Sequence, residues 1–222
     1  MTIVIAVDGT AASGKGTLAK KLALHFGFAH LDSGSLYRLV ALGVDEAGSD
    51  PADESRALAA AHALDLSRAG EPVIRSDRIG KMASQVSAHP AVRAALLQFQ
   101  RDFAQRPLGA SPGAVIDGRD IGTVICPDAT AKLFVDAHPE RRARRRWLEL
   151  QGLGIARDEG ELLAELVARD LADRTRPISP MVPASDALLL DTSDLDIDAA
   201  FAAALALVNP KVEAALKARP RG

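Results

Sequence analysis

Near the N-terminus the chain reads Gly9-Thr10-Ala11-Ala12-Ser13-Gly14-Lys15-Gly16-Thr17. It follows residues 2–8, a β-branched apolar run typical of a parallel strand buried on both faces. Apolar residues then recur at helical spacing from Leu18 to Phe26, and Gly27 ends the helix. A glycine-rich turn between a strand and a helix is the context that a phosphate-binding loop requires. We therefore predict that residues 9–17 bind the phosphates of a nucleotide.

The chemistry of this loop follows from its backbone and from one side chain. Glycines allow successive amides to point inward as a nest for phosphate oxygens, and the helix N-terminus adds partial positive charge. Lys15 adds a full charge that can reach the β- and γ-phosphates, so we predict that it is catalytic. Gly16 stands where such loops usually have the Ser or Thr that holds Mg²⁺. No residue is therefore predicted as a direct metal ligand.

The rest of the chain alternates strand-like and helix-like segments. Further strands are predicted at residues 28–31, 114–117, 132–136 and 187–191, with a strand-like fragment at 72–74. Helices are predicted at residues 35–44, 52–64, 90–103, 140–150, 161–172 and 197–208, with a polar, frayed tail after Pro210. This alternation predicts an α/β fold in which helices cover both faces of a parallel sheet.

Composition excludes several classes of protein. The 222 residues carry a formal net charge of −2, which excludes a chain-wide basic field for nucleic acid. The single cysteine, Cys126, allows no internal disulfide and no cysteine–histidine zinc cluster. No apolar run reaches the roughly 18 residues of a membrane span, and no basic segment precedes the first strand. We expect a soluble, cytoplasmic monomer without a membrane or nucleic-acid partner.

Polar residues follow two of the predicted strands, where ligands of open α/β sheets bind. Asp32-Ser33-Gly34-Ser35-Leu36-Tyr37-Arg38 follows the second strand; its serines also suit a helix cap, and Arg38 also suits a solvated surface. Asp117-Gly118-Arg119-Asp120 follows a later strand, where Asp117 is placed to hold water around Mg²⁺. For Arg119 and Asp120, a purely structural ion pair is the alternative. Residues 169, 173 and 176 have the spacing of one helix face.

Together these motifs resemble the bacterial cytidylate kinase family. The pattern comprises GxxxSGKGT, LDSGxxYR, ASQVxxxPxVR at 83–93, IDGRDxGTVxxPxA at 116–129, KLFVDA and RDxxDRxR, in the family's order from residue 3 to 191. The resemblance implies a P-loop kinase fold with a five-stranded parallel sheet. It also implies a small insertion that binds the nucleoside monophosphate, at about residues 45–105, and a mobile lid at about residues 138–175. The insertion is shortened in this chain at residues 66–81, where relatives form a small extra sheet.

The resemblance assigns roles to individual residues. In the acceptor pocket, the residues that correspond to phosphate-binding residues of the family are Arg38, Arg119 and Arg176. Those that correspond to residues reading the cytosine base are Ser84, Arg93 and Asp120, and those that correspond to residues holding the ribose are Arg169 and Asp173. Asp32 and Ser33 correspond to further residues that line the pocket. The lid corresponds to the arginine stretch 141–146, where Arg145 and Arg146 are the expected catalytic residues, and to the turn at 152–160. The family holds Mg²⁺ mainly through phosphates and water.

The implied activity is transfer of the γ-phosphoryl group of ATP to CMP or dCMP. Two alternatives remain at this point. One is a P-loop kinase for another small acceptor, such as UMP, AMP or shikimate. The other is a non-enzymatic nucleotide switch whose arginine stretch binds RNA, against which stand the net acidity and the near absence of interleaved aromatic residues.

Overall fold

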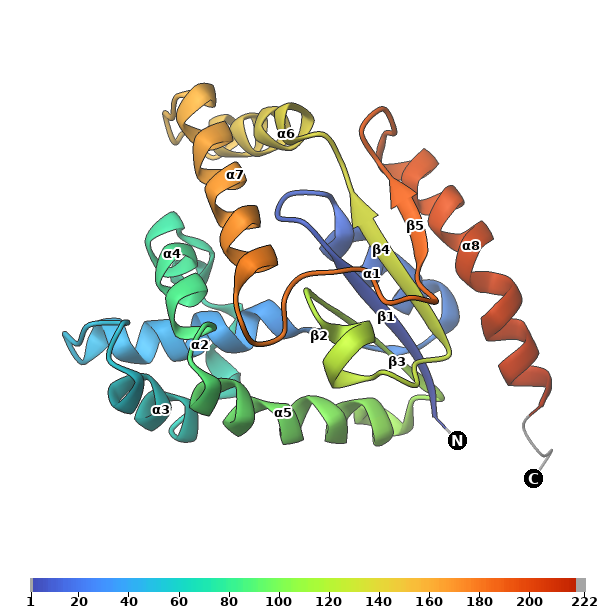
Figure 1. Ribbon diagram of the computed structural model, residues 1–222. Helices are drawn as coiled ribbons and strands as arrows, with labels where there is room; N and C mark the ends of the chain where they lie inside the picture. Colours follow the sequence, from blue (N-terminus) through green and yellow to red (C-terminus); the bar gives the residue numbers. More distant parts are fainter. Residues whose placement is uncertain (1, 219–222) are drawn as a thin grey trace. The chain divides into compact units, whose positions relative to one another are not determined.

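The structure of the protein is a computed structural model in which residues 2–218 are described (Figure 1). The chain divides into two compact units. The sheet unit comprises Met1–Leu31 and Ala104–Gly222, and the helical unit comprises Asp32–Phe103. Each is described by itself.

The sheet unit contains the predicted parallel sheet. Its five strands lie in the order β2-β3-β1-β4-β5. The bounds are Ile3–Gly9 for β1, Ala29–Asp32 for β2, Gly113–Gly118 for β3, Ala131–Asp136 for β4 and Leu188–Asp191 for β5. The α/β fold class and its five-stranded parallel sheet are confirmed, with β1 paired in parallel to both β3 and β4.

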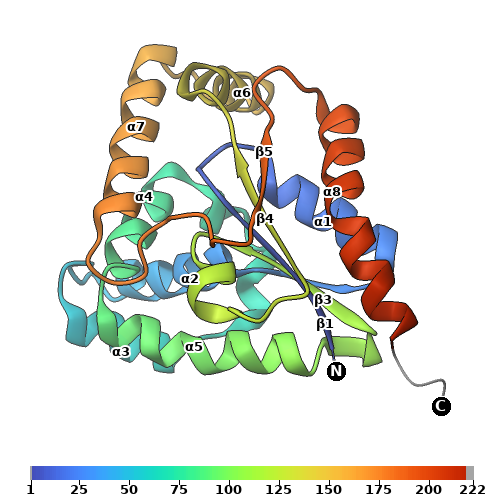
Figure 2. The same ribbon diagram turned by 45° about the vertical axis from the view of Figure 1, so that its right-hand side comes forward.

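Every residue of β1 is buried, as its unbroken apolar run predicts. Ile3, Ile5 and Val7 face a core shared with α1 (Lys15–Phe26) and α8 (Ile197–Lys217), which lie on one face of the sheet (Figure 2). The glycine at the end of β1 is obligatory, because a Cβ on Gly9 would lie 1.9 Å from the carbonyl oxygen of Val135. The phosphate loop therefore starts where the backbone of β4 leaves no room for a side chain on β1.

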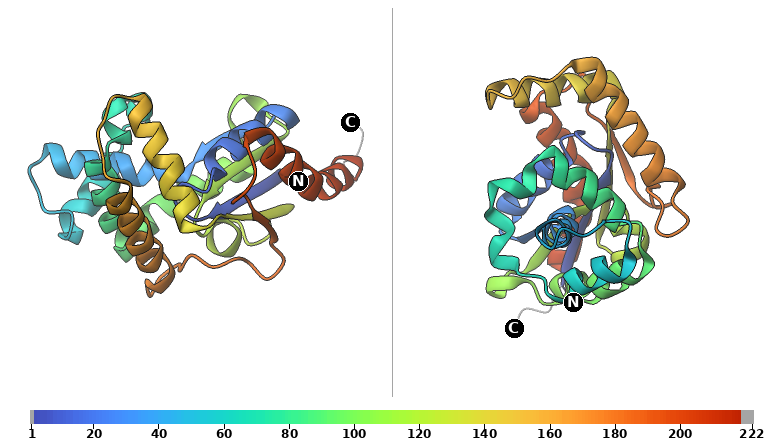
Figure 3. Two further views of the ribbon diagram at one scale, coloured as in Figure 1. Left: turned by 90° about the horizontal axis from the view of Figure 1, so that it is seen from above. Right: turned by 90° about the vertical axis from the view of Figure 1, so that its left-hand side faces the viewer.

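Two helices of the sheet unit follow β4 and pack against each other (Figure 3). They are α6 (Pro139–Gly152) and α7 (Glu159–Thr175), and they confirm the predicted helices at 140–150 and 161–172. A short π-helical turn, η4 (Ile121–Ile125), follows β3, and a 3₁₀ turn, η3 (Leu108–Ala110), precedes it.

The last helix differs from the sequence prediction. Instead of ending at Val208 before a frayed tail, α8 continues through Pro210 to Lys217. Val212, beyond the proline, is buried in the core beside Val208, and this packing holds the last turns. By length and composition α8 could cross a membrane, which corrects the expectation that no segment would pass that test. Length and composition do not distinguish a membrane span from a core helix, and α8 places one face in the core of the sheet unit.

The helical unit departs from the family expectation of a small extra sheet. Residues 33–103, all of which are described, form only helices and turns. These are α2 (Ser33–Glu46), α3 (Glu54–His62), η1 (Leu66–Gly70), η2 (Pro72–Arg75), α4 (Asp77–Val86) and the start of α5 (Pro90–Gln105). The fragment at 72–74, predicted as strand-like, is a 3₁₀ turn whose Ile74 is buried among α2 and α4 side chains, with no strand beside it to pair with.

Candidate active site

The loop after β1 has the backbone geometry that anion binding requires. Ala12 and Gly14 both have left-handed backbone angles, with φ of 58° and 87°, and Gly14 is the N-cap of α1. Such alternation curls the peptide planes around a hollow in which amides can converge. The Ser13 hydroxyl donates to the Thr10 carbonyl, and the Lys15 ammonium lies 3.4 Å from the same oxygen. The predicted donor residues therefore form one compact loop.

Asp117 lies at the carboxyl end of β3 and faces this loop. A Cβ on Gly16 would lie 3.6 Å from its Oδ2 atom. Its Oδ1 atom is 2.8 Å from Nε2 of His30 on β2, and its side chain is almost fully buried. His30 was not predicted from the sequence, because one histidine in a short strand carries no local signal.

The residues around the phosphate loop fit a metal held mainly by other ligands. Among residues 2–218, no group of three or more histidine, cysteine or acidic side chains is arranged to hold a metal ion. Asp117 is one carboxylate beside the loop, and Gly16 supplies no oxygen. A Mg²⁺ ion carried by the nucleotide would therefore find one carboxylate, that of Asp117, beside this loop.

Asp8 was also missed, and it supports the loop after β3. Its two carboxylate oxygens accept hydrogen bonds from the amides of Ile121 and Gly122, at 2.8 and 2.7 Å. Burial raises the pKa of this carboxyl to about 6, although the two amides and Lys15 act in the opposite direction. Asp8 therefore ties the start of the phosphate loop to the turn that follows Asp120.

This shift predicts a pH dependence of stability. The folded-state pKa lies above the unfolded value of 3.8, so the folded protein binds more protons than the unfolded chain between about pH 4 and 6. The contribution of Asp8 to the free energy of unfolding should therefore increase as pH falls through that window, by about 3 kcal/mol in total. Urea unfolding of the protein and of Asp8→Asn from pH 4 to 7 measures it. A difference between the two proteins that does not change with pH would contradict the prediction.

A buried cluster of arginines and carboxylates joins two of the predicted motifs. Nε of Arg119 donates to Oδ2 of Asp173 at 2.9 Å, across 54 positions in the chain. Arg176 lies 3.6 Å from Asp120 and 3.8 Å from Asp173. The sequence analysis predicted that Arg176 would share a helix face with Asp173. Instead, α7 ends at Thr175 and Arg176 is extended, which turns its side chain toward the loop after β3.

The electrostatics of this cluster favour an anion. With Arg169, which lies one turn before Asp173 on α7, it holds three arginines and two carboxylates. Burial by itself would raise the pKa of the Asp173 carboxyl, but the charges of Arg119, Arg169 and Arg176 hold it below its usual value. Three arginines and two carboxylates give the cluster a formal net positive charge. Because Asp120 and Asp173 are buried, solvent screens the charges of this cluster less than charges at the surface.

The helical unit carries the other predicted acceptor residues. Asp32 is the N-cap of α2, where its carboxylate accepts from the amide and hydroxyl of Ser35, so the aspartate and not a serine caps the helix. Ser33 is buried in the first turn. Arg38 is not a solvated surface charge, because its guanidinium donates to the carbonyls of Ile74 and Ser76.

Gly80 leaves the space that Arg38 occupies. A Cβ at this position on α4 would lie 3.0 Å from Nη2 of Arg38. Ser84 is half-buried on the same helix, and Arg93 on α5 is buried, with Nη1 donating to the Ser87 carbonyl and its guanidinium over the Tyr37 ring. Arg75, which the sequence analysis did not select, lies 3.0 Å from Asp32.

The five arginines of residues 141–146 have different environments. Arg141 and Arg144 are exposed and pair with Asp194 and Glu159. Arg145 donates to the backbone carbonyls of Thr192 and Leu195, after β5, and Arg146 pairs with Glu149. Arg142, by contrast, is fully buried.

With this geometry in place, comparison with known proteins gives the family. Residues 5–210 match the sequence model of the family described as Cytidylate kinase. The chain belongs to the cytidylate kinase family. The protein of Nitrobacter winogradskyi named cytidylate kinase is 55% identical over 207 residues, which are 93% of this chain and 96% of that protein. The cytidylate kinase of Bradyrhizobium diazoefficiens is 50% identical over 220 residues, 99% of this chain and 100% of its own.

A solved structure supports the fold of this cytidylate kinase family member independently of close sequence similarity. The structure of an uncharacterized protein from Eubacterium ventriosum aligns with a TM-score of 0.53 at 16% identity, over 94% of this chain and 99% of that chain. At that identity the likeness shows the fold alone.

Proposed function

We propose that this protein transfers the γ-phosphoryl group of ATP to CMP, and also to dCMP, which gives ADP and CDP or dCDP. Membership of the cytidylate kinase family supports the reaction class. The observation that carries the proposal is the buried cluster of Arg119, Asp120, Asp173 and Arg176, because it joins cations for a phosphate with a carboxylate for a base. The helical unit then serves as the monophosphate-binding insertion and α6–α7 as the lid region.

In this proposal the phosphate loop binds the donor. Residues 9–17 surround the β- and γ-phosphates, and Lys15 compensates the charge that moves during transfer. Asp117 holds water around the Mg²⁺ that accompanies ATP, and the ion supplies charge compensation on the phosphates. The acceptor oxygen of CMP is already anionic, so the reaction needs in-line positioning more than a general base.

The acceptor residues divide by the part of CMP that they contact. Arg38, Arg119 and Arg176 bind the phosphate. Arg169 and Asp173 hold the ribose, while Ser84, Arg93 and Asp120 read the cytosine edge. Asp32 and Ser33 are further residues for CMP binding. Their chemistry supports these assignments, because guanidinium groups match phosphate oxygens and carboxylates match hydroxyl and amino donors.

A panel of acceptors tests the function. ADP release from ATP and Mg²⁺ should be rapid with CMP and dCMP and at least tenfold slower with UMP, AMP or shikimate. Rapid release with one of the last three instead would identify a different P-loop kinase. Absence of release with every acceptor, together with salt-dependent RNA binding, would favour the nucleotide switch. We also propose that the protein acts in the cytoplasm as a monomer, which gel filtration of the purified chain can check.

The lid gives a further prediction. If Arg145 and Arg146 act on the transferred phosphate when the lid closes, replacing both by Gln should lower kcat on the order of 10-fold. This reduction is smaller than the roughly 10²–10³-fold reduction in kcat that loss of one preorganised donor commonly causes. The KM for CMP should change less than threefold. Steady-state kinetics with varied CMP measures both constants.

The control for the lid variant is Lys21→Gln, which removes a half-buried cation on α1 that pairs with Asp198 on α8. It should leave kcat as it is. An unchanged kcat in the Arg145 and Arg146 variant would mean that these arginines only anchor α6, Arg145 to the loop after β5 and Arg146 to Glu149.

A further inference from the structure

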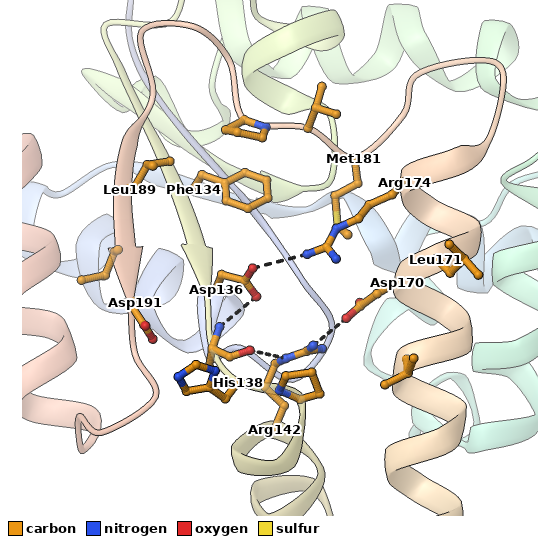
Figure 4. A pocket seen from close by; sticks show the side chains of 16 residues that line it. Phe134, Asp136, His138, Arg142, Asp170, Leu171, Arg174, Met181, Leu189 and Asp191 are labelled. Carbon is orange, nitrogen blue, oxygen red and sulfur yellow. Dashed lines mark hydrogen bonds and ion pairs between the residues drawn. The ribbon is translucent and has the colours of Figure 1, made fainter.

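Arg142 differs from the other arginines of residues 141–146, because its buried side chain is unlike that of a residue in a mobile lid. Its side chain is 2% exposed. Nε donates to the Ala137 carbonyl at 2.8 Å, and Nη2 lies 2.6 Å from Oδ2 of Asp170 (Figure 4). Nη1 donates to the Ala11 carbonyl at 3.0 Å. One guanidinium therefore joins the end of β4, the phosphate loop and α7, all within the sheet unit.

The contact with Ala11 has a consequence for the donor site. In a planar trans peptide the carbonyl of one residue and the amide of the next point in opposite directions. Because Arg142 fixes the Ala11 carbonyl, it also fixes the Ala12 amide to point away from Arg142. That amide belongs to the loop whose converging amides receive phosphate oxygens.

The backbone conformation at the Ala11–Ala12 peptide is unfavourable by itself. Ala12 has a φ of 58°, in the left-handed region that residues with a Cβ adopt only at a cost of about 1 kcal/mol or more. Another peptide orientation would relieve this cost but would turn the Ala12 amide elsewhere. A buried, charged donor on the Ala11 carbonyl opposes that change.

Asp170 orients the guanidinium. It is 3% exposed, and its position on α7 lies between Arg169 and Asp173, two of the proposed ribose residues. Its Oδ1 atom is buried without a hydrogen-bond partner among the described residues, so the pair is not optimised for stability alone. Buried ion pairs are in general poor stabilisers, since apolar replacements of both partners are often as stable.

The two residues line a cavity of about 780 Å³ bounded by β4, β5, the loop at 181–183 and α7 (Figure 4). Asp136 and Arg174 meet across the same cavity, 3.4 Å apart. Oδ1 of Asp136 also accepts the Thr10 hydroxyl of the phosphate loop at 2.7 Å. Thr10, Asp136 and Arg174 thus form a second, weaker connection between the phosphate loop and α7, in addition to the one through Arg142.

We propose that Arg142 and Asp170 are positioning residues that hold the strained Ala11–Ala12 peptide in its phosphate-binding orientation and couple it to α7. Neither residue contacts a substrate in this scheme. The proposal rests on the proposed kinase function for its kinetic consequence, but its effect on ATP binding can be measured without any acceptor.

The test measures ATP affinity separately from stability. Titration calorimetry with ATP and magnesium chloride, thermal unfolding, and kcat with CMP are compared for the natural protein, Arg142→Met, and the double variant Arg142→Met with Asp170→Leu. Arg142→Met should weaken ATP binding and lower kcat, each about 10- to 100-fold, the scale of a misplacement of about 1 Å. It should also lower the Tm, because Asp170 is left as an unpaired buried charge.

The double variant separates positioning from folding. It should recover most of the lost Tm while ATP affinity and kcat remain low, because nothing then holds the Ala11 carbonyl. Recovery of affinity and kcat to within threefold of the natural protein, together with the Tm, would overturn the proposal. So would an Arg142→Met protein whose ATP affinity stays within threefold of the natural protein. If Arg142→Met does not fold, Arg142→Lys takes its place and should show an intermediate loss of affinity.

Lys132→Met is the matched control. Lys132 is a nearly buried cation on β4 of the same unit, paired with Asp186, and it contacts no residue of the phosphate loop in the described hydrogen bonds. Its loss should lower the Tm and leave ATP affinity unchanged. Failure of the proposed function would appear separately, as absence of ADP release with CMP in the natural protein despite measurable ATP binding.

Discussion

Replacement of Lys15 by Ala should lower kcat for CMP about 10²–10³-fold while the fold remains intact, because one preorganised charge at the transferred phosphate commonly contributes that much. The Lys15 ammonium lies 3.4 Å from the Thr10 carbonyl within its own loop. Steady-state kinetics at saturating ATP and CMP measures the loss, and circular dichroism checks the fold.

The control for the charge of Lys15 is Lys15→Arg, which keeps a cation but replaces a compact ammonium by a planar fork on a longer stem. It should retain more activity than Lys15→Ala and less than the natural protein. A Lys15→Ala protein that keeps more than half of the natural kcat would contradict the assignment of this loop as the donor site.

Replacement of Asp120 by Asn should lower the ratio of kcat/KM for CMP to kcat/KM for UMP by about 10²-fold. Sites that hydrogen-bond the edge of a substrate can give ratios of up to roughly 10⁴. Cytosine presents an amino donor at N4 where uracil presents an acceptor at O4. A carboxylate accepts from the amino group but repels the O4 acceptor, whereas an amide can donate to it. The narrowing should come mainly from a loss with CMP. Arg93 adds to the discrimination, since it suits the N3 and O2 acceptors of cytosine but opposes the N3–H of uracil.

The measurement is kcat/KM for both nucleotides on both proteins, with Asp173→Asn as the matched control. Asp120 and Asp173 are both buried carboxylates near Arg176, so each variant removes one negative charge from the same cluster. Asp173→Asn should lower kcat/KM for CMP and UMP by similar factors. If Asp120→Asn leaves the ratio unchanged, Asp120 does not read the base and serves as a partner for Arg176.

Those parts of this protein that depend on local patterns could be predicted from its amino-acid sequence. An unbroken apolar run before a glycine-rich turn predicted β1 and the phosphate loop, since a strand buried on both faces needs no alternation. Alternating strand and helix periods predicted the parallel sheet, and the order of short motifs predicted the family. Each strand, turn and helix is read from a short local stretch, where chain geometry fixes which side chains share a face.

Residues of one type are distinguished only by contacts between distant parts of the chain. Arg141 and Arg142 are neighbours of one type, yet the first has 62% of its side chain exposed and the second 2%. Their difference depends on Ala11 and Asp170, 131 and 28 positions away from Arg142, which no local period can reveal.

The same reason explains the corrected elements. Residues 72–74 have strand-like side chains, but a strand forms only where a neighbour offers backbone hydrogen bonds, and Ile74 packs among helices instead. A proline such as Pro210 usually ends or kinks a helix. Here Val212 is buried in the core of the sheet unit, and α8 continues past the proline. The link between Arg119 and Asp173 spans 54 positions and exists only because β3 and α7 fold back to the same end of the sheet unit. Local propensity chooses among possible elements, and contacts between distant segments determine which of them is stable.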